Sequence, residues 1–227
     1  MTLIDLALGF VQICGVTILA FGAVKAVYVP LALYFNRVHR PRKAKHKYSL
    51  ISAKPLVSVI VPGYNEAVVI TNCVESILRS RYLRLEVILV DDGSTDSTAE
   101  IMARLAGQYD RVRFISRTNA GKGAALNTGI AAARGDVLMF VDADGIFAPD
   151  TLMYMLEGFD HPKVGAVCGD DRPVNLNRVQ TMMLAVLSHV GTGLVRRALS
   201  LAHCLPIVSG NIGAFRADLV HQLGGFP

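Results

Sequence analysis

Val57-Ser58-Val59-Ile60-Val61-Pro62-Gly63-Tyr64-Asn65-Glu66 joins a nearly continuous apolar run to an abrupt polar end. An apolar run of this kind is typical of a parallel strand that is buried on both faces. Pro62 and Gly63 favour a turn, so the strand should end there. Because ligands of open α/β sheets bind at the carboxyl ends of the strands, the polar residues that follow are the first candidates for a functional site.

Short β-branched runs alternate with helical patterns along the rest of the chain, as a helix-covered parallel sheet requires. We expect further strands at residues 86–91, 112–116, 137–141 and 164–168. We expect helices at residues 66–79, 96–107, 121–133 and 149–158. The predicted fold class is α/β, an open sandwich with a mostly parallel sheet. Residues 176–205 form one more helical pattern, which could lie in a core or at a membrane surface.

Residues 1–36 form a strongly apolar segment, and residues 6–24 carry no charge at all. This length suits a transmembrane helix, since about 20 helical residues cross the hydrocarbon core of a bilayer. A secretory signal peptide fits less well because the first charged residue of the segment, Asp5, is acidic and the basic residues come after the apolar stretch. A buried core helix is the other alternative. A basic linker, residues 37–54, follows and favours the cytoplasmic side. We therefore expect one inner-membrane span and a cytoplasmic domain at residues 55–227.

The charge distribution argues against a nucleic-acid partner. The chain has a formal net charge of +5, but residues 48–227 hold 16 Lys and Arg against 17 Asp and Glu. The excess positive charge is therefore confined to the region beside the predicted span, where it can contact anionic lipids. The four cysteines are widely spaced, which indicates reduced packing residues and no zinc site.

Asp142 and Asp144 follow an apolar strand and are separated by one residue. Strand alternation places both carboxylates on one side of the chain, where they could share a cation. Carboxylate oxygens suit Mg²⁺ or Mn²⁺, whose coordination is commonly completed by water and substrate phosphates. The alternative is a pair of turn carboxylates, which Gly145 and Pro149 nearby would favour.

Asp91 and Asp92 end another apolar strand and precede a Gly-Ser-Thr-Asp segment. Buried carboxylates need hydrogen-bond donors, which a nucleotide base or ribose offers. We expect one of the two to contact a ligand and the other to cap the next helix. Residues 62–66 could also contact a nucleotide, because they combine a rigid turn and polar groups with an aromatic ring that can face a base. The alternative is a simple turn before a helix.

Lys122 lies between Gly121 and Gly123 just before a predicted helix. The free N–H groups of a helix start attract anions, so the lysine could contact a phosphate. The segment does not match a P-loop, because Ser116 stands where the first Gly is required and Gly123, followed by Ala124, stands where Ser or Thr is required. ATP hydrolysis is therefore not predicted.

Together these motifs resemble the ordered motifs of family 2 glycosyltransferases. The resemblance is carried by the segments Val57–Glu66, Val90–Asp96, Asn119–Asn127 and Val141–Asp144, and it extends over about residues 55–227. It is closest to the membrane-bound synthases of hyaluronan, chitin oligosaccharides and poly-N-acetylglucosamine. The resemblance implies a GT-A fold, a UDP-sugar donor, a saccharide or lipid-linked acceptor, and possible partner subunits of a synthase.

The resemblance also implies roles for individual residues. Uridine would be held by Pro62, Tyr64, Glu66 and Asp92, with Asn65 and Asp91 in the same donor-binding set. Lys122 would approach the nucleotide or its phosphates, and Asp142 and Asp144 would bind ribose, diphosphate and metal. The acceptor side would be lined by Ser209, Gly210 and Asn211, for which a Gly-rich turn between strands is the alternative.

The general base of such enzymes would lie in a Thr-Glu-Asp-like motif soon after Pro227, and Trp, which a later family motif requires, is absent. We therefore expect this chain to be C-terminally incomplete. The predicted function is an inverting, metal-dependent transfer of a hexose or N-acetylhexosamine to a growing polysaccharide. Two alternatives remain: a truncated nucleotide-binding or synthase-partner membrane protein, and a lipid-phosphate glycosyltransferase that adds one sugar.

Overall fold

The structure is a computed structural model. It describes residues 12, 15–16, 19, 22–23, 26–27, 29–34, 54–159, 161–169, 172–188, 193–201, 205, 208 and 211–226. The chain divides into two compact units. One consists of Met1–Lys45 with Asp170–Ile207, and the other of His46–Gly169 with Val208–Pro227.

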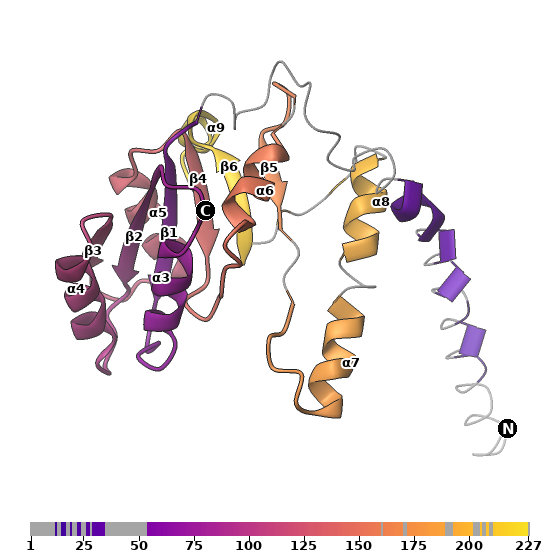
Figure 1. The fold of residues 1–227 in the computed structure, drawn as a ribbon, viewed down its shortest axis with the longest axis horizontal. Helices are drawn as coiled ribbons and strands as arrows, with labels where there is room; N and C mark the ends of the chain where they lie inside the picture. The colour runs from indigo at the N-terminus through magenta and orange to yellow at the C-terminus, as the bar shows by residue number, and fades with distance from the viewer. Residues whose placement is uncertain are drawn as a thin grey trace, which may run out of the picture. The chain divides into compact units, whose positions relative to one another are not determined.

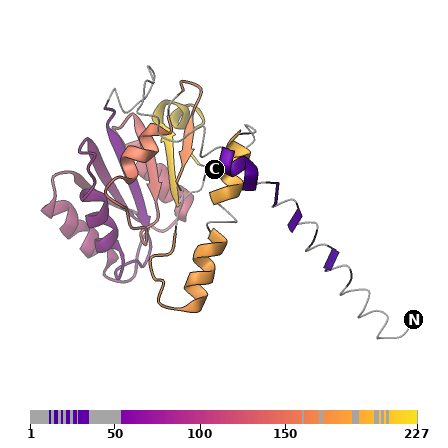
Figure 2. The ribbon, with the colours of Figure 1, turned by 45° about the vertical axis from the view of Figure 1, so that its right-hand side comes forward.

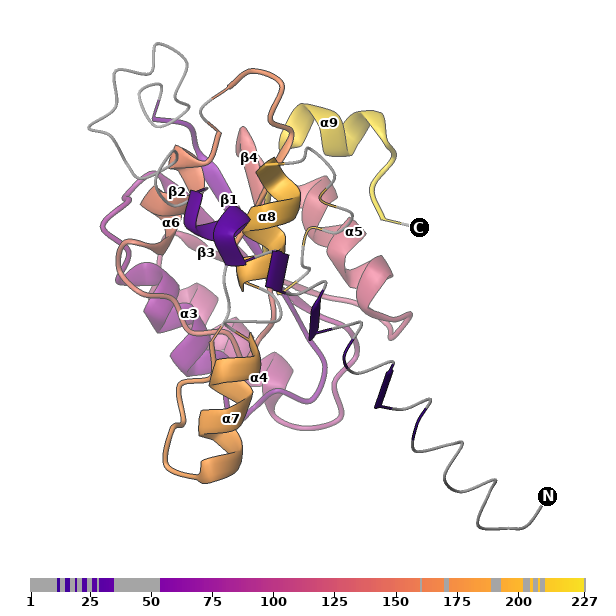
Figure 3. The ribbon, with the colours of Figure 1, turned by 90° about the vertical axis from the view of Figure 1, so that its right-hand side faces the viewer.

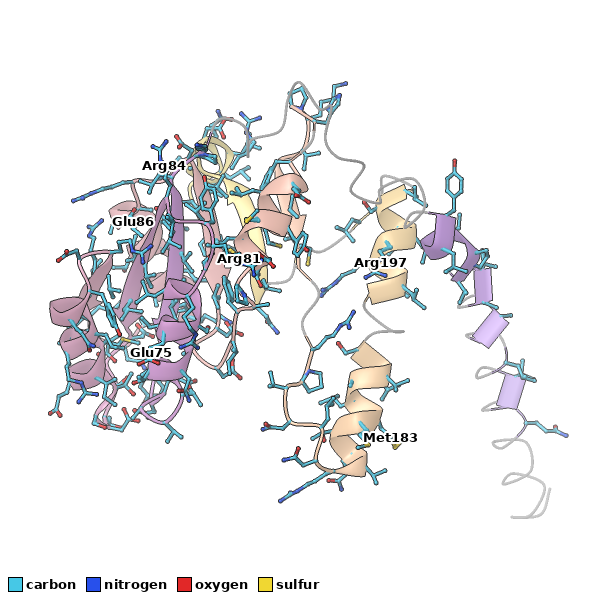
Figure 4. All side chains as sticks on the ribbon, viewed as in Figure 1. Glu75, Arg81, Arg84, Glu86, Met183 and Arg197 are labelled. Carbon is cyan, nitrogen blue, oxygen red and sulfur yellow. The ribbon has the colours of Figure 1, made fainter. Side chains whose placement is uncertain are left out.

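The first unit contains helices α7 (Val179–Ser188) and α8 (Val195–Leu201), so the predicted pattern at residues 176–205 forms separate helices. Helix α7 has no buried residue, and Met183 on it is 61% exposed (Figure 4). Within the part of the chain that is described, none of the helices combines the length and the apolarity needed to cross a bilayer. Much of the predicted span at residues 1–36, and nearly all of the basic linker at residues 37–54, lies outside the described residues.

The second unit is built on a six-stranded sheet with the strand order β3-β2-β1-β4-β6-β5 (Figures 1 and 2). The strands are β1 (Val57–Gly63), β2 (Leu85–Asp91), β3 (Val112–Ser116), β4 (Val137–Val141), β5 (Ala166–Cys168) and β6 (Ile212–Arg216). The helices are α3 (Ile70–Leu78), α4 (Thr98–Gln108), α5 (Lys122–Ala132), α6 (Thr151–Glu157) and α9 (Ala217–Gln222).

Alternation along the strands sends side chains to two separate cores. Val57, Val59 and Val61 of β1 pack with helices α3, α4 and α6 on one face of the sheet. Ile60 packs with helices α5 and α9 on the other face. Figure 3 shows these two helices on the same side of the sheet. Every residue of β1 and β2 is buried, which explains why both strands are almost continuously apolar.

The α/β fold class is confirmed, and the sheet is mixed. Strands β1, β2, β3 and β4 pair in parallel, whereas β6 is antiparallel to both β4 and β5. The sequence patterns did not predict β6, because Gly213 and Ala214 have weak β-propensity. Helix α3 begins later than expected, at Ile70, because Asn65 adopts a left-handed φ of 59° and the chain turns before the helix starts.

Register brings the polar strand ends together. Gly63 of β1 pairs with Asp91 of β2, and Asp91 pairs with Ser116 of β3. Strand β4 runs parallel to β1 on its other side and ends at Val141. The residues that follow β1, β2 and β4 therefore leave the sheet at the same edge.

Candidate functional site

A cleft of about 260 Å³ opens at this carboxyl edge of the sheet. Most of the residues predicted to bind the donor line it, although they come from four separate segments. The lining residues are Pro62, Gly63, Tyr64, Glu66, Asp92, Lys122, Ala125, Asp142, Ala143 and Asp144. Asn65 and Asp91 do not line the cleft, and neither does Asn211, which precedes β6. Ser209 and Gly210 lie outside the described residues.

Asp142 and Asp144 both face the cleft from the loop after β4. The Lys122 ammonium lies 2.5 Å from Oδ1 of Asp142, in an ion pair whose side chains are 53% and 30% exposed. The Asp142 backbone carbonyl accepts hydrogen bonds from the Gly145 amide at 2.9 Å and from the Cys73 thiol at 3.6 Å. These contacts fix the loop in which the two carboxylates lie.

Helix α3 supports this loop from behind. Ser76 accepts a hydrogen bond from the Phe147 amide at 2.9 Å and donates one to the Cys73 carbonyl at 2.7 Å. Beyond the helix, Arg81 forms an ion pair with Asp150 at 3.0 Å. These supporting residues were not predicted from the sequence, because nothing in a helical pattern shows which loop the helix will contact.

Asp92 organises the loop that leads to Lys122. Its carboxylate accepts hydrogen bonds from the amides of Ala120, at 3.1 Å, and Gly121, at 2.8 Å. Arg117 adds an ion pair, with 3.2 Å between its Nε and Oδ1 of Asp92. Asp92 therefore lines the cleft while its oxygens hold the start of α5. Arg117 was not predicted to be a site residue. Its position just ahead of the Asn119–Gly123 segment was the one signal in the sequence that pointed to it.

Asn65 and Asp91 shape the neighbouring loops. The side-chain oxygen of Asn65 accepts a hydrogen bond from the backbone amide of Thr95 at 2.8 Å. The backbone amide of Asn65 donates a hydrogen bond to the Ser94 hydroxyl at 3.0 Å. Asp91 accepts hydrogen bonds from the Ser94 amide, at 3.2 Å, and the Ser116 hydroxyl, at 3.4 Å. The loops after β1 and β2 are thus joined by side chains, which holds Tyr64 and Glu66 at the cleft.

The electrostatics of the cleft are acidic. Burial, followed by the charges of Asp144, Asp142 and Asp96, raises the pKa of Glu66 above its ordinary value. Burial, with smaller contributions from Asp144 and Asp142, raises the pKa of the Cys73 thiol to about 12. The negative charges of Asp142 and Asp144 therefore act on Glu66 across the cleft and on Cys73 in the helix behind the loop.

The residues of the cleft fit a divalent ion that is bound together with a diphosphate. Asp142 and Asp144 offer hard oxygen ligands on the cleft wall, and Mg²⁺ or Mn²⁺ commonly takes only one or two carboxylates beside phosphates and water. Across the described ranges, no group of three or more His, Cys, Asp or Glu side chains is arranged to hold a metal.

A mixed α/β sheet with an acidic cleft at its carboxyl edge is the architecture of the GT-A glycosyltransferases. The chain belongs to a known family, because residues 58–223 match Glycosyl transferase family 2. Its homologues include the poly-β-1,6-N-acetyl-D-glucosamine synthase of Staphylococcus aureus, which is 32% identical over 200 residues. That match covers 85% of this chain and 48% of the synthase, so the chain spans about half the length of the curated relatives it matches.

Solved structures agree with this assignment. The mannosyltransferase PcManGT from Pyrobaculum calidifontis, in complex with GDP-Man and Mn²⁺, is 31% identical, with a TM-score of 0.65 over 90% of this chain and 57% of that chain. Glucosyl-3-phosphoglycerate synthase from Mycobacterium tuberculosis, in complex with UDP, is 26% identical, with a TM-score of 0.53 over 80% of this chain and 64% of that chain. These likenesses confirm the resemblance to family 2 glycosyltransferases.

Proposed function

We propose that the protein is the donor-binding part of a metal-dependent, inverting glycosyltransferase that uses a UDP-sugar. The observation that carries the proposal is the convergence of Asp142, Asp144, Lys122, Tyr64 and Glu66 on one cleft. Carboxylates for a cation, a lysine for phosphates and an aromatic ring for a base are the groups that a nucleotide diphosphate needs. They come from separate strand ends, so chance clustering along the sequence does not account for them.

The cleft residues have different roles in this proposal. Pro62, Tyr64, Glu66 and Asp92 bind the uridine, and Tyr64 offers a ring that is 48% exposed and can stack on a base. Asn65 and Asp91 act through the loops that carry these residues. We also propose that the acceptor side is lined by Ser209, Gly210 and Asn211.

The charge of the cleft supports metal dependence. Asp92 is paired with Arg117, so among the described residues that line the cleft Glu66, Asp142 and Asp144 stand against one positive charge, that of Lys122. A diphosphate that entered such a cleft alone would be repelled by these carboxylates. A divalent ion held by Asp142 and Asp144 would supply positive charge for the diphosphate and stabilise it as a leaving group.

The proposed reaction is an attack by an acceptor hydroxyl on the anomeric carbon of the sugar, on the side opposite the diphosphate. The hydroxyl loses its proton to a general base, the new glycosidic bond forms, and the bond to the diphosphate breaks with inversion. We assign none of the cleft carboxylates as this base, which we expect to come after Pro227 in a longer protein. The residues described here bind and orient the donor and its diphosphate.

We infer that the donor is UDP-N-acetylglucosamine or a related UDP-hexose and that the product is a polysaccharide. The 32% identity to a poly-β-1,6-N-acetyl-D-glucosamine synthase over 85% of the chain supports this choice. We further propose that residues 1–36 anchor the enzyme in the inner membrane with the cleft in the cytoplasm, where partner subunits of a synthase could join it. The apolar segment and the basic residues after it support this location.

A second candidate is a transferase that adds one sugar to a lipid-linked acceptor. The likeness to PcManGT, a mannosyltransferase in complex with GDP-Man that aligns with 90% of this chain at 31% identity, bears on the donor of such an enzyme. GDP-mannose would then be the donor to compare with UDP-sugars. The length of the product separates the two candidates, because a polymerase extends its product and a single-addition enzyme does not.

The test is sugar transfer by a longer form of the protein that continues past Pro227. It should be incubated with Mn²⁺ and, separately, UDP-N-acetylglucosamine, UDP-glucose and GDP-mannose, with product length and anomeric configuration measured by mass spectrometry and NMR. We expect β-linked oligomers from a UDP-sugar and none when EDTA replaces Mn²⁺. Retention of the anomeric configuration, or equal transfer in EDTA, would refute the proposed mechanism.

A further inference from the structure

Lys122 has an unusual position for a residue expected to bind phosphate. Among the described residues that line the cleft, it is the one basic side chain. Its ammonium contacts Oδ1 of Asp142 at 2.5 Å, which is one of the oxygens we assign to the divalent ion. A positive charge therefore already lies where the cation would bind.

We propose that Lys122 neutralises Asp142 in the nucleotide-free protein and thereby makes metal binding depend on the nucleotide. A diphosphate that arrives together with the divalent ion draws the ammonium away from Asp142, and the carboxylate that is released binds the ion. The inference rests on the proposed function, because it assigns a second role to a residue of the donor site.

The structure fixes the base of the Lys122 side chain and leaves its end movable. Lys122 is the first residue of α5, and Asp92 holds the preceding amides of Ala120 and Gly121. The ion pair itself is partly exposed, with 53% of the Lys122 side chain accessible. Because exposed ion pairs contribute little free energy, the ammonium can leave Asp142 at small cost when phosphate oxygens are offered.

Two electrostatic effects then favour joint binding of the divalent ion and the nucleotide. Without nucleotide, a divalent ion at Asp142 would have to displace the ammonium and remain close to it, and the two positive charges repel. With a diphosphate present, Lys122 contacts phosphate oxygens and Asp142 joins Asp144 at the ion. The nucleotide therefore contributes both ligands for the metal and a second binding partner for the lysine.

The experiment measures Mn²⁺ binding by the EPR signal of free Mn²⁺, using the full chain with and without UDP. The variant Lys122→Gln removes the charge, and Lys122→Arg retains it. Lys163→Gln serves as the matched control, because Lys163 is an exposed lysine that does not line the cleft. Circular dichroism checks that each variant is folded.

Wild type should bind Mn²⁺ weakly alone and at least tenfold more tightly with UDP. Lys122→Gln should bind Mn²⁺ alone about tenfold more tightly than wild type, with a reduced further gain from UDP. Lys122→Arg and Lys163→Gln should both behave like wild type in the absence of UDP.

If UDP strengthens Mn²⁺ binding in wild type while Lys122→Gln leaves the nucleotide-free affinity unchanged or weaker, the inference is overturned and the proposed function stands. If wild type fails to bind Mn²⁺ even with UDP, the proposed donor site is itself wrong, and the inference is overturned with it.

Discussion

The side-chain amide of Asn127 forms two hydrogen bonds with the backbone of Phe226, each of 2.8 Å. One is donated to the Phe226 carbonyl, and the other is accepted from the Phe226 amide. The Phe226 ring packs edge-on against Phe140 of β4, with 5.0 Å between ring centroids. Helix α5, which begins at Lys122, is thus attached to the segment that precedes Pro227.

Asn127→Ala should lower the free energy of unfolding by about 1–3 kcal/mol, because two half-buried backbone groups lose their partner. Urea denaturation measures this change. Gln108→Ala is the control, since the Gln108 side chain is exposed and its amide donates a hydrogen bond to the neighbouring Tyr109 hydroxyl at 3.3 Å. Equal effects of the two substitutions would show that the Asn127 contacts do not stabilise the fold.

Glu86 should support stability at neutral pH and lose this effect in acid. Burial alone would raise the pKa of Glu86, but hydrogen bonds from Ser58, the Arg134 amide and Arg113, with the charge of Arg113, hold it below the ordinary 4.5. A lowered folded-state pKa stabilises the protein above the unfolded-state value, and the effect disappears as pH falls through the folded-state value.

Glu86→Gln should therefore destabilise by about 2 kcal/mol at pH 7, and the difference from wild type should shrink below pH 4.5. Glu75→Gln is the control, because Glu75, which is labelled in Figure 4, forms an exposed ion pair with Arg79. Urea denaturation at a series of pH values gives both curves. A difference between wild type and Glu86→Gln that persists unchanged into acid would contradict the assignment.

Cys73 should resist alkylation in the folded protein. Burial, and then Asp144 and Asp142, raise its pKa from 9.0 to about 12, so about a thousandfold less thiolate is present at pH 8. Iodoacetamide labelling followed by peptide mass spectrometry measures the rate. The half-buried Cys168 should react faster, and Cys73 should react readily in urea. Equally fast labelling of native and denatured Cys73 would be inconsistent with the burial behind Asp142.

Asn65→Ala should destabilise by about 1–3 kcal/mol, because it removes the hydrogen bonds to the loop after β2 and places Ala at a φ of 59°. Asn65→Gly loses the same hydrogen bonds without the backbone strain, so it should be less destabilising. Thermal denaturation distinguishes the two variants. If Asn65→Ala is less destabilising than Asn65→Gly, the left-handed backbone conformation of residue 65 does not determine the cost of these substitutions.

The parts of the fold that the sequence predicted are those with strong local signals. Strands β1, β2 and β4 are largely apolar runs buried on both faces, and polar residues follow them directly. Strand β6 was missed because a short run with Gly213 and Ala214 acquires strand geometry only by pairing with β4 and β5. Helix starts were displaced where a side chain such as Asn65 stabilises a turn.

The cleft was predicted more completely than its support. Residues at strand ends share one sheet edge, so Asp142, Asp144 and Glu66 could be grouped from topology alone. The contacts of Asp92 with Arg117 and of Cys73 with Asp142 depend on how loops fold back, which no periodicity encodes. The contact between Lys122 and Asp142 is of the same kind.

The most direct test of the account is UDP binding, measured by isothermal titration calorimetry with Mn²⁺ and with EDTA. Wild type should bind UDP at least tenfold more tightly with Mn²⁺, and Asp142→Asn and Asp144→Asn should each lose that gain. Asp218→Asn, a change in an exposed ion pair outside the cleft, should retain it. Equal UDP affinity with Mn²⁺ and EDTA, or a gain that survives both cleft substitutions, would contradict the claim that Asp142 and Asp144 bind a metal–diphosphate complex.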